Sequence, residues 1–273
     1  SVEAQTRKLF KVCAMRHIPI FTFINKMDRD AMDMFELLDD IEKELGIATC
    51  PINWPIGSGK NFKGVYDRAN QQVHVFSDTE KGTKEGEDTV LNMEEAEQYV
   101  GEELFAQLND EIELLDGASA EFDQEQVDKG LLSPVFFGSA LTNFGVEIFL
   151  KHFLKMTSSP LPRKADIGVI DPMEEEFSAF VFKIQANMNK AHRDRIAFMR
   201  ICSGRFDASQ EVRHVQGNKV MRLSQPQQIM ADERKILDEA YAGDIIGVFD
   251  PGIFSIGDTV CMPKEKFAYE GIP

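Results

Sequence analysis

The sequence feature that most constrains the fold is a short apolar run, HIPIFTFI, at residues 17–24. Its β-branched and aromatic side chains would face both sides of a sheet, which is typical of a buried strand in a parallel sheet. The polar tetrapeptide Asn-Lys-Met-Asp follows at 25–28, and residues 31–46 then place apolar side chains at helical spacing before a glycine. Strand, polar loop and helix in this order predict one βα unit of an α/β domain.

A second βα unit is predicted near the middle of the chain. Residues 135–137, Val-Phe-Phe, form an apolar strand, residues 138–145 a loop, and residues 146–156 an amphipathic helix. Ligands of open α/β sheets bind beyond the carboxyl ends of the strands. The loops at 25–28 and 138–145 are therefore expected to share one ligand site.

The second half of the chain has a different pattern. Residues 158–166, SSPLPRKAD, form a linker with two prolines, so we place one domain at 1–165 and another at 166–273. From residue 177 onward, short apolar runs are separated by turn residues, and helical periodicity is lost. This spacing predicts an all-β domain, either a closed barrel or a sandwich.

Residues 47–130 interrupt the α/β pattern and are expected to be an insertion. The part at 47–77 is rich in Pro, Gly and β-forming residues, which predicts short strands and turns. The part at 93–117 predicts one long amphipathic helix with an acidic solvent face. Its apolar stripe consists of Ala96, Val100, Leu104, Leu108, Ile112 and Leu115.

Charge is unevenly distributed along the chain, with an acidic segment at 78–128 and a basic stretch at 183–205. The net charge of −16 argues against DNA binding by the chain as a whole. Eighteen of the 46 acidic residues but two of the 30 basic residues fall within 78–128, so this segment alone accounts for the imbalance. The stretch at 183–205 is basic, and a nucleic-acid contact there remains open.

Several classes of protein are not indicated by the sequence. No apolar run approaches the ~18 residues of a membrane span, and no N-terminal secretion signal is recognisable. The four cysteines are far apart and the five histidines lack metal-ligand spacing, so we expect reduced thiols and no metal site. These signals favour a cytoplasmic protein without a membrane partner.

The tetrapeptide at 25–28 has the chemistry needed to recognise guanine. Guanine presents two adjacent donors on its pairing edge, and the acceptor-only carboxylate of Asp28 can take both. Adenine would place a lone pair against the same carboxylate and would be rejected. The stem of Lys26 can cover the face of the base, and Asn25 can donate to the base edge and brace the neighbouring loops.

The second loop is expected to complete the base site. Gly138 opens the sequence GSAL, where the small side chains of Ser139 and Ala140 let backbone N–H groups approach guanine O6. A rival GASA at 117–120 follows a helix rather than a strand and is rejected. Asn25, Lys26, Met27, Asp28, Ser139 and Ala140 are therefore the predicted guanine-binding residues.

A phosphate-binding loop is not found in the sequence. The pattern G-x-x-x-x-G-K-[ST] is approached at GSGK, but Trp54 stands at the first glycine position and Asn61 at the hydroxyl position. We interpret GSGK as a turn. The chain is expected to start inside a GTP-binding domain, with the phosphate loop, magnesium site and catalytic residues upstream of Ser1. No catalytic residue is assigned, and the fragment alone is predicted to be inactive.

Four segments of the chain carry a resemblance to a known family. They are INWPIGSGKNFKGVYD, FVFKIQANMNKAHRDRIAFMRICSGRF, AYAGDIIGV and FSIGDTV. They closely resemble the bacterial peptide chain release factor 3 family, within the translational GTPases that include elongation factor G. The chain looks like a middle fragment. The resemblance implies the C-terminal part of a P-loop GTPase domain, with a Rossmann-like parallel sheet, followed by a translation-factor β-barrel.

The resemblance also implies an activity and partners. The family binds GTP or GDP, acts on the ribosome and promotes dissociation of class-I release factors after peptide release. In relatives the barrel domain touches ribosomal RNA. This gives the basic stretch a role, with the candidate rRNA contacts Lys190, Arg193, Arg195 and Arg200.

Two alternative functions stay open at the level of the sequence. The parent protein could be another translational GTPase, of the elongation factor G or ribosome-protection type. The chain could also be a non-enzymatic module that docks on the ribosome through the barrel and the acidic helix.

Overall fold

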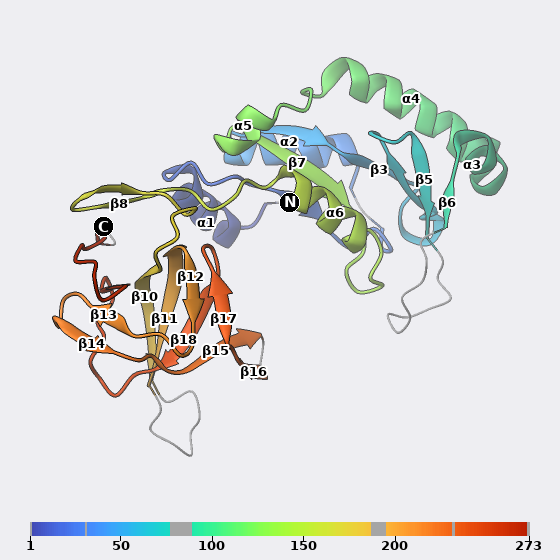
Figure 1. Ribbon diagram of the computed structural model, residues 1–273. Helices are drawn as coiled ribbons and strands as arrows, with labels where there is room; N and C mark the ends of the chain where they lie inside the picture. The colour runs from blue at the N-terminus through green and yellow to red at the C-terminus, as the bar shows by residue number, and fades with distance from the viewer. Residues whose placement is uncertain (1, 31, 77–88, 187–194, 231–232, 272–273) are drawn as a thin grey trace. The chain divides into compact units, whose positions relative to one another are not determined.

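The computed structural model describes residues 2–30, 32–76, 89–186, 195–230 and 233–271 (Figure 1). The chain divides into two compact units, Ser1–Thr157 and Ser158–Pro273. The division lies after Thr157 rather than at the predicted residue 165. Ala165 forms a β-bridge with Tyr269, which attaches the linker region to the second unit.

The first unit is built around a parallel sheet with strand order β1-β7-β2. Its elements are α1 (Ala4–Ala14), β1 (Thr22–Ile24), α2 (Met34–Leu45), β2 (Ala48–Pro51), β3 (Asn53–Ile56), η1 (Gly59–Asn61), β4 (Gly64–Asp67), β5 (Gln72–Val75), β6 (Val90–Leu91), α3 (Met93–Val100), α4 (Glu102–Ala118), α5 (Gln124–Asp128), β7 (Leu132–Phe137) and α6 (Val146–Met156). Both predicted βα units are present.

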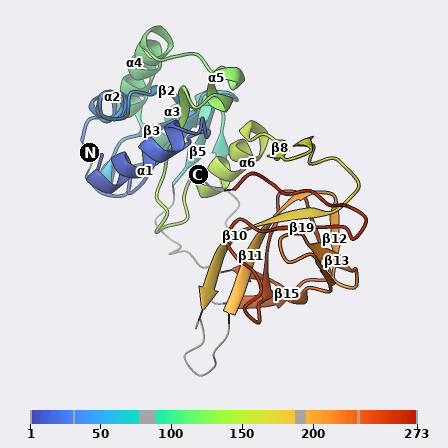
Figure 2. The same cartoon turned by 90° about the vertical axis from the view of Figure 1, so that its left-hand side faces the viewer.

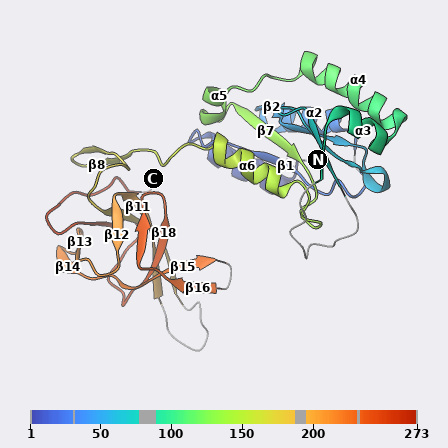
Figure 3. The ribbon, with the colours of Figure 1, turned by 45° about the vertical axis from the view of Figure 1, so that its right-hand side comes forward.

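Helices pack on the parallel sheet (Figure 3). Its strand β7 is buried along its whole length. On one face, the ring of Phe149 in α6 lies 5.6 Å from Phe23 and 5.1 Å from Phe136. On the other, Leu38 of α2 belongs to the same apolar cluster as Phe137. The strand β7 carries both clusters because successive side chains of a strand point to opposite faces.

The helix α2 has clear start and stop signals. The Asp33 carboxylate accepts from the backbone N–H groups of Phe35 and Glu36 at 2.9 and 3.1 Å, which satisfies two donors of the first turn. Gly46 ends the helix in a left-handed conformation with φ 69°. Sequence and structure agree here because the signals are local.

Residues 47–130 are predicted to interrupt the α/β pattern, but β2 at their start pairs with β7 in the parallel sheet. The strands after it form an antiparallel sheet, β3-β4-β5-β6, and two longer helices follow. The prediction of one long helix is wrong, because the chain breaks at Gly101 (φ 88°, ψ 156°) into α3 and α4. Figure 1 shows α3 and α4 beside the antiparallel sheet that contains β3, β5 and β6. Trp54 of β3 is fully buried, and its Nε1 donates to the Glu111 carboxylate of α4 at 2.6 Å.

The second unit is made of strands, as predicted. They are β8 (Arg163–Ala165), β9 (Gly168–Ile170), β10 (Ser178–Ala186), β11 (Arg195–Ser203), β12 (Arg205–Asp207), β13 (Val212–His214), β14 (Lys219–Met221), β15 (Ser224–Met230), β16 (Glu233–Ile236), β17 (Glu239–Tyr241), β18 (Ile245–Phe249) and β19 (Thr259–Cys261). Eight of them form a curled antiparallel sheet of order β14-β13-β19-β10-β11-β18-β15-β16 (Figure 2). Its apolar faces enclose the core of this unit.

Candidate nucleotide-binding site

The loops after β1 and β7 meet at the carboxyl edge of the parallel sheet. Ile24 and Phe137, the last residues of the two strands, are paired. Gly138 N donates to Ile24 O, and Met27 N donates to Gly138 O, both at 3.1 Å. The backbone itself therefore joins loop 25–28 to loop 138–145, as expected for parallel neighbours.

The Asn25 side chain also joins the two loops. Its Oδ1 accepts from Lys26 N and from Ala140 N, both at 2.8 Å. The first of these bonds accompanies a left-handed backbone at Lys26, with φ 70°, which is uncommon for a residue other than Gly, Asn or Asp. Asn25 thus braces the neighbouring loop as the sequence predicts.

Asp28 is fixed by a residue from the second loop. The hydroxyl of Ser139, which is fully buried, donates to Asp28 Oδ1 at 2.6 Å. Because a carboxylate has about four lone-pair sites, Asp28 keeps acceptor capacity for a ligand. The structure therefore brings Asp28 and Ser139 together and leaves Asp28 half-exposed, with Lys26 and Ala140 on the exposed surface nearby.

Met27 differs from its neighbours in this loop. Its side chain has no exposed surface and belongs to the apolar cluster of the first unit. Met27 therefore contributes its backbone to the site, while its side chain anchors the loop in the core. The motif alone does not distinguish these two contributions.

The backbone donors of the second loop are already engaged. Ser139 N donates to Phe144 O at 3.0 Å, and Ala140 N donates to Asn25 Oδ1. The sequence predicts that these N–H groups face guanine O6, whereas in the structure each has a protein acceptor. The loop closes on itself because Ser139 and Phe144 form an antiparallel bridge.

Gly138 is required because the start of this loop lies close both to the end of the loop and to the neighbouring strand β1. A Cβ atom at this position would lie 2.6 Å from Phe144 O and 2.8 Å from the Phe23 ring. Both distances are shorter than real Cβ contacts. The glycine of the GSAL sequence thus has a packing reason that is independent of any ligand.

A third segment contacts the site, and sequence reasoning missed it. Gly59, in the turn read as GSGK, donates its N–H to Met27 O at 3.1 Å. The glycines of GSGK correctly indicate a turn, with η1 at its centre. No local signal could place that turn against loop 25–28, because the contact joins segments far apart in the sequence.

The basic stretch of the second unit is described in part. Lys190 and Arg193 lie outside the described residues. Arg200 is exposed on β11. Arg195 donates to Asp250 Oδ2 at 2.7 Å and to Phe254 O at 2.8 Å. At least part of its guanidinium group is therefore bonded within the protein.

The hydrogen bonds that Asp250 accepts, including the one from Arg195, lower its pKa. Burial alone would raise the pKa of Asp250. Backbone N–H donors at Ile253 and Gly252, together with Arg195, outweigh it and hold the pKa below its ordinary value. The pairing with Arg195 therefore stabilises the folded second unit.

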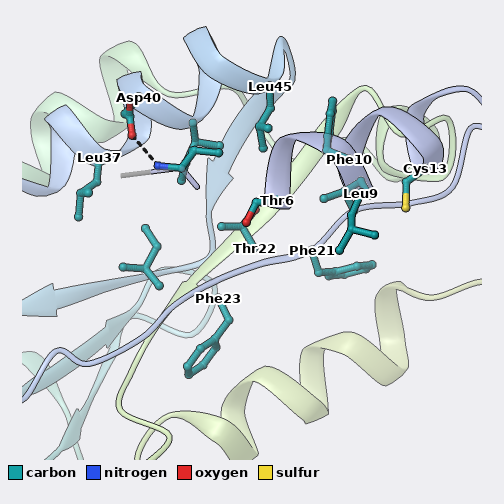
Figure 4. Close-up of a pocket in the computed structure, with 14 residues that line it drawn as sticks. Thr6, Leu9, Phe10, Cys13, Phe21, Thr22, Phe23, Leu37, Asp40 and Leu45 are labelled. Carbon is teal, nitrogen blue, oxygen red and sulfur yellow. Dashed lines mark hydrogen bonds between the residues drawn. The ribbon is translucent and has the colours of Figure 1, made fainter. Parts of the chain in front are cut away.

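A separate cavity of about 520 Å³ lies between α1, α2 and β1 (Figure 4). Its lining is largely apolar, with Leu9 and Phe10 from α1 and Phe21 before β1. The strand β1 is half-buried rather than fully buried as predicted, because it forms one edge of the sheet beside this cavity. Its polar side chains include the hydroxyls of Thr6 and Thr22 and the Asp40 carboxylate, which accepts from Val2 N at 3.0 Å.

The part of the chain that the structure describes contains neither a cluster of metal-ligating side chains nor a helix able to span a membrane. No group of three or more His, Cys, Asp or Glu side chains there could hold a metal ion. None of the helices that the structure describes is long and apolar enough to cross a membrane.

Comparison with known proteins yields two family matches. Residues 1–159 match the elongation factor Tu GTP binding domain, and residues 176–262 match elongation factor G domain 2. The predicted fold class, a GTPase-type α/β domain followed by a translation-factor β-domain, is confirmed by these matches.

Whole-chain similarity points to one group of relatives. The chain is 57% identical to peptide chain release factor 3 of Symbiobacterium thermophilum, 53% to that of Gloeobacter violaceus and 49% to that of Microcystis aeruginosa. Each match covers 100% of this chain but 50 to 52% of the relative, so the chain spans about half the length of these proteins. The predicted resemblance is confirmed, and the chain belongs to the elongation factor Tu GTP-binding domain family, with release factor 3 proteins among its relatives.

Proposed function

We propose that this chain is part of a GTP-binding translation termination factor and contains its guanine-recognition site. One observation carries the proposal. Two loops from adjacent parallel strands are joined by two side-chain hydrogen bonds, one from Ala140 N to Asn25 and one from Ser139 to Asp28. The names of the relatives support the choice of release factor 3 over other translational GTPases.

The proposed roles follow from the donors and acceptors. Asp28, positioned by Ser139, accepts the N1–H and N2 amino groups of guanine. Guanine O6 shares the Ala140 N–H with Asn25 Oδ1, as a three-centre bond. The exposed Lys26 covers the face of the base with its aliphatic stem. Met27 holds the loop through its backbone and its buried side chain.

Hydrolysis is assigned to the full-length protein rather than to this segment. The 273 residues contain no G-x-x-x-x-G-K-[ST] sequence, so we assign phosphate and magnesium binding to other parts of that protein. The isolated segment would bind nucleotide weakly and would not hydrolyse it. The full-length protein would act on the ribosome in the cytoplasm, release class-I release factors, and contact rRNA through the basic stretch.

Exchanging Asp28 for asparagine tests the base site. The introduced amide would present a donor to guanine donors, whereas xanthine has a carbonyl there. We expect the affinity of the full-length D28N protein for GTP to fall about 100-fold or more, and its affinity for xanthosine triphosphate to rise. Equilibrium titration with both nucleotides measures this.

The exposed Asp39 of α2 provides the matched control. The variant Asp39→Asn removes a carboxylate from the same unit and should leave both affinities unchanged. Unaltered GTP affinity in the D28N protein would show that the guanine site has been assigned to the wrong residues.

A further inference from the structure

The turn at residues 57–62 touches the base-recognition loop 25–28 at the backbone. Gly59 is buried, has φ 57°, and donates its N–H to Met27 O at 3.1 Å. A Cβ atom on Gly59 would lie 2.2 Å from Asp30 Oδ1 and 3.1 Å from Asp30 N. The turn therefore bonds to the loop at Met27 and lies so close to Asp30, two residues further on, that a side chain at residue 59 would have to displace Asp30.

The same turn also contacts the other recognition loop. The ring of Phe62, which is buried, packs edge-on against Phe144 with ring centroids 5.5 Å apart. Phe76 closes the group, 5.1 Å from Phe62 and 5.3 Å from Phe144. Phe144 in turn exchanges two backbone hydrogen bonds with Ser139, at 3.0 and 2.9 Å. Phe62 thus supports the loop that carries Ser139 and Ala140.

The turn is also held in shape by hydrogen bonds of its own and by the two strands that it connects, β3 and β4. Lys63 N donates to Ile56 O at 2.9 Å, and Phe62 N donates to Gly59 O at 3.2 Å, which closes the connection from β3 to β4. A Cβ atom on Gly57 would lie 2.2 Å from Asn61 O, so this turn is tight at its first residue too. The turn therefore has close internal contacts of its own, in addition to its contacts with the two loops.

We propose that the turn 57–62 is the positioning element of the guanine site. Gly59 fixes the position of loop 25–28 through its bond to Met27, and Phe62 fixes the position of loop 138–145 through its contact with Phe144. This proposal rests on the proposed function of the site. A carboxylate that takes two parallel hydrogen bonds tolerates little displacement, and a misplacement of about 1 Å can cost 100-fold in a positioned interaction. Gly59 and Phe62 would be positioning residues that never touch the nucleotide.

The position of the turn has a consequence for selectivity. Inosine lacks the N2 amino group of guanosine, so it loses one of the two bonds to Asp28. A correctly placed Asp28 should therefore distinguish GDP from inosine diphosphate. A displaced Asp28 should lose this discrimination, because neither bond is then well formed. The ratio of the two affinities reports the position of the loop, and a loss of folded protein does not change it.

The test compares Gly59→Ala with Gly46→Ala in the full-length protein. Gly46 has a similar φ, 69° against 57°, but a Cβ there meets no atom within 4 Å. Both changes impose backbone strain, and only the Cβ of Gly59→Ala meets another segment, at the side chain and backbone N of Asp30, two residues beyond loop 25–28. We expect Gly59→Ala to weaken GDP binding tenfold or more and to bring the GDP-to-inosine diphosphate ratio towards one. Gly46→Ala should lower the melting temperature and keep the ratio of the unaltered protein.

A second variant decides the matter if Gly59→Ala does not fold. Phe62→Leu keeps an apolar side chain but removes the ring contact with Phe144, and it should also reduce the ratio. An unchanged ratio in the variants that fold overturns the proposal, even if both affinities fall together.

The Asp28→Asn protein separates this proposal from the proposed function. If Asp28→Asn leaves GDP binding unchanged, the guanine site itself is wrongly assigned and the inference fails with it. If Asp28→Asn abolishes GDP binding while Gly59→Ala and Phe62→Leu keep the ratio, the site stands and the positioning role of the turn is refuted.

Discussion

Asp67 shows how a single buried residue links three elements of the first unit. The carboxylate at the end of β4 is 3% exposed and accepts from Asn70 Nδ2 at 2.7 Å. The imidazole Nε2 atoms of His74 in β5 and His152 in α6 each lie 3.9 Å from its Oδ2. Burial would raise the pKa of Asp67, but the interaction with His152 and the bonds from Asn70 lower it to about 2.

This lowered pKa predicts how stability depends on pH. The folded pKa lies below the ordinary value of 3.8, so the stabilisation is present above pH 3.8 and is lost as the pH falls to about 2. It amounts to about 2 kcal/mol. We expect Asp67→Asn to lower the free energy of unfolding at pH 7 by about this amount, measured by urea denaturation.

The same variant should lose much of the pH dependence between pH 4 and 2. Asp110→Asn, at an exposed position on α4, is the control and should behave like the unaltered chain. An Asp67→Asn chain with the full acid transition would assign that transition to other carboxylates.

For single residues, the sequence predicts which side chains come together at the site better than it predicts how far each is exposed. Asn25, Asp28, Ser139 and Ala140 could be brought together because two βα patterns imply a shared sheet edge. The burial of Met27 depends on the packing of the whole unit, which a tetrapeptide does not encode.

Among the elements, the break between α3 and α4 is the clearest departure from prediction. The apolar stripe continues across Gly101, and Ala96, Val100, Leu108 and Leu115 are all buried, so periodicity alone indicates one helix. The helices nevertheless follow an antiparallel sheet of consecutive strands, β3-β4-β5-β6, and periodicity does not encode the direction in which they pack beside it. Gly101 allows the change of direction because its positive φ carries little steric cost.

Two glycines on these helices should respond in opposite ways to alanine. Gly101→Ala forces a side chain into a strained backbone, at a cost of about 1–3 kcal/mol. Gly117→Ala lies within α4, where a Cβ meets no atom within 4 Å, and should add up to about 1 kcal/mol of stability. Thermal unfolding of the two variants measures the difference. A gain in stability from Gly101→Ala would mean that α3 and α4 can merge into one helix without loss of packing.

At the scale of the whole molecule, the two units match separate families, and the sequence predicts both because their periodicities differ. Alternation of strand and helix defines the first unit, and short strands define the second. The boundary between the two units is harder to predict from the sequence. Residues 158–166 look like a linker, but a β-bridge between Ala165 and Tyr269 makes part of them a portion of the second unit.

The proposed activity of the full-length protein predicts which ribosomal complex stimulates it. GTP hydrolysis should rise most with ribosomes that hold a class-I release factor after peptide release. It should rise less with ribosomes awaiting translocation or with vacant ribosomes. Phosphate release under multiple turnover measures the three rates. Greatest stimulation by the complexes awaiting translocation would instead indicate a translocase of the elongation factor G type.

The edge position of β1 gives the two halves of the guanine site different local stability. The strand β7 is buried throughout, whereas β1 is half-buried and α1 has no buried side chain. Segments with few buried contacts open first in local unfolding. Amide hydrogen exchange in the isolated chain should therefore be faster in α1 and β1 than in β7, with equal rates arguing against this order. The loop that carries Asp28 would then follow the less stable strand, and the loop that carries Ser139 the more stable one. Bound guanine, which contacts both loops, would therefore slow the local unfolding of the first.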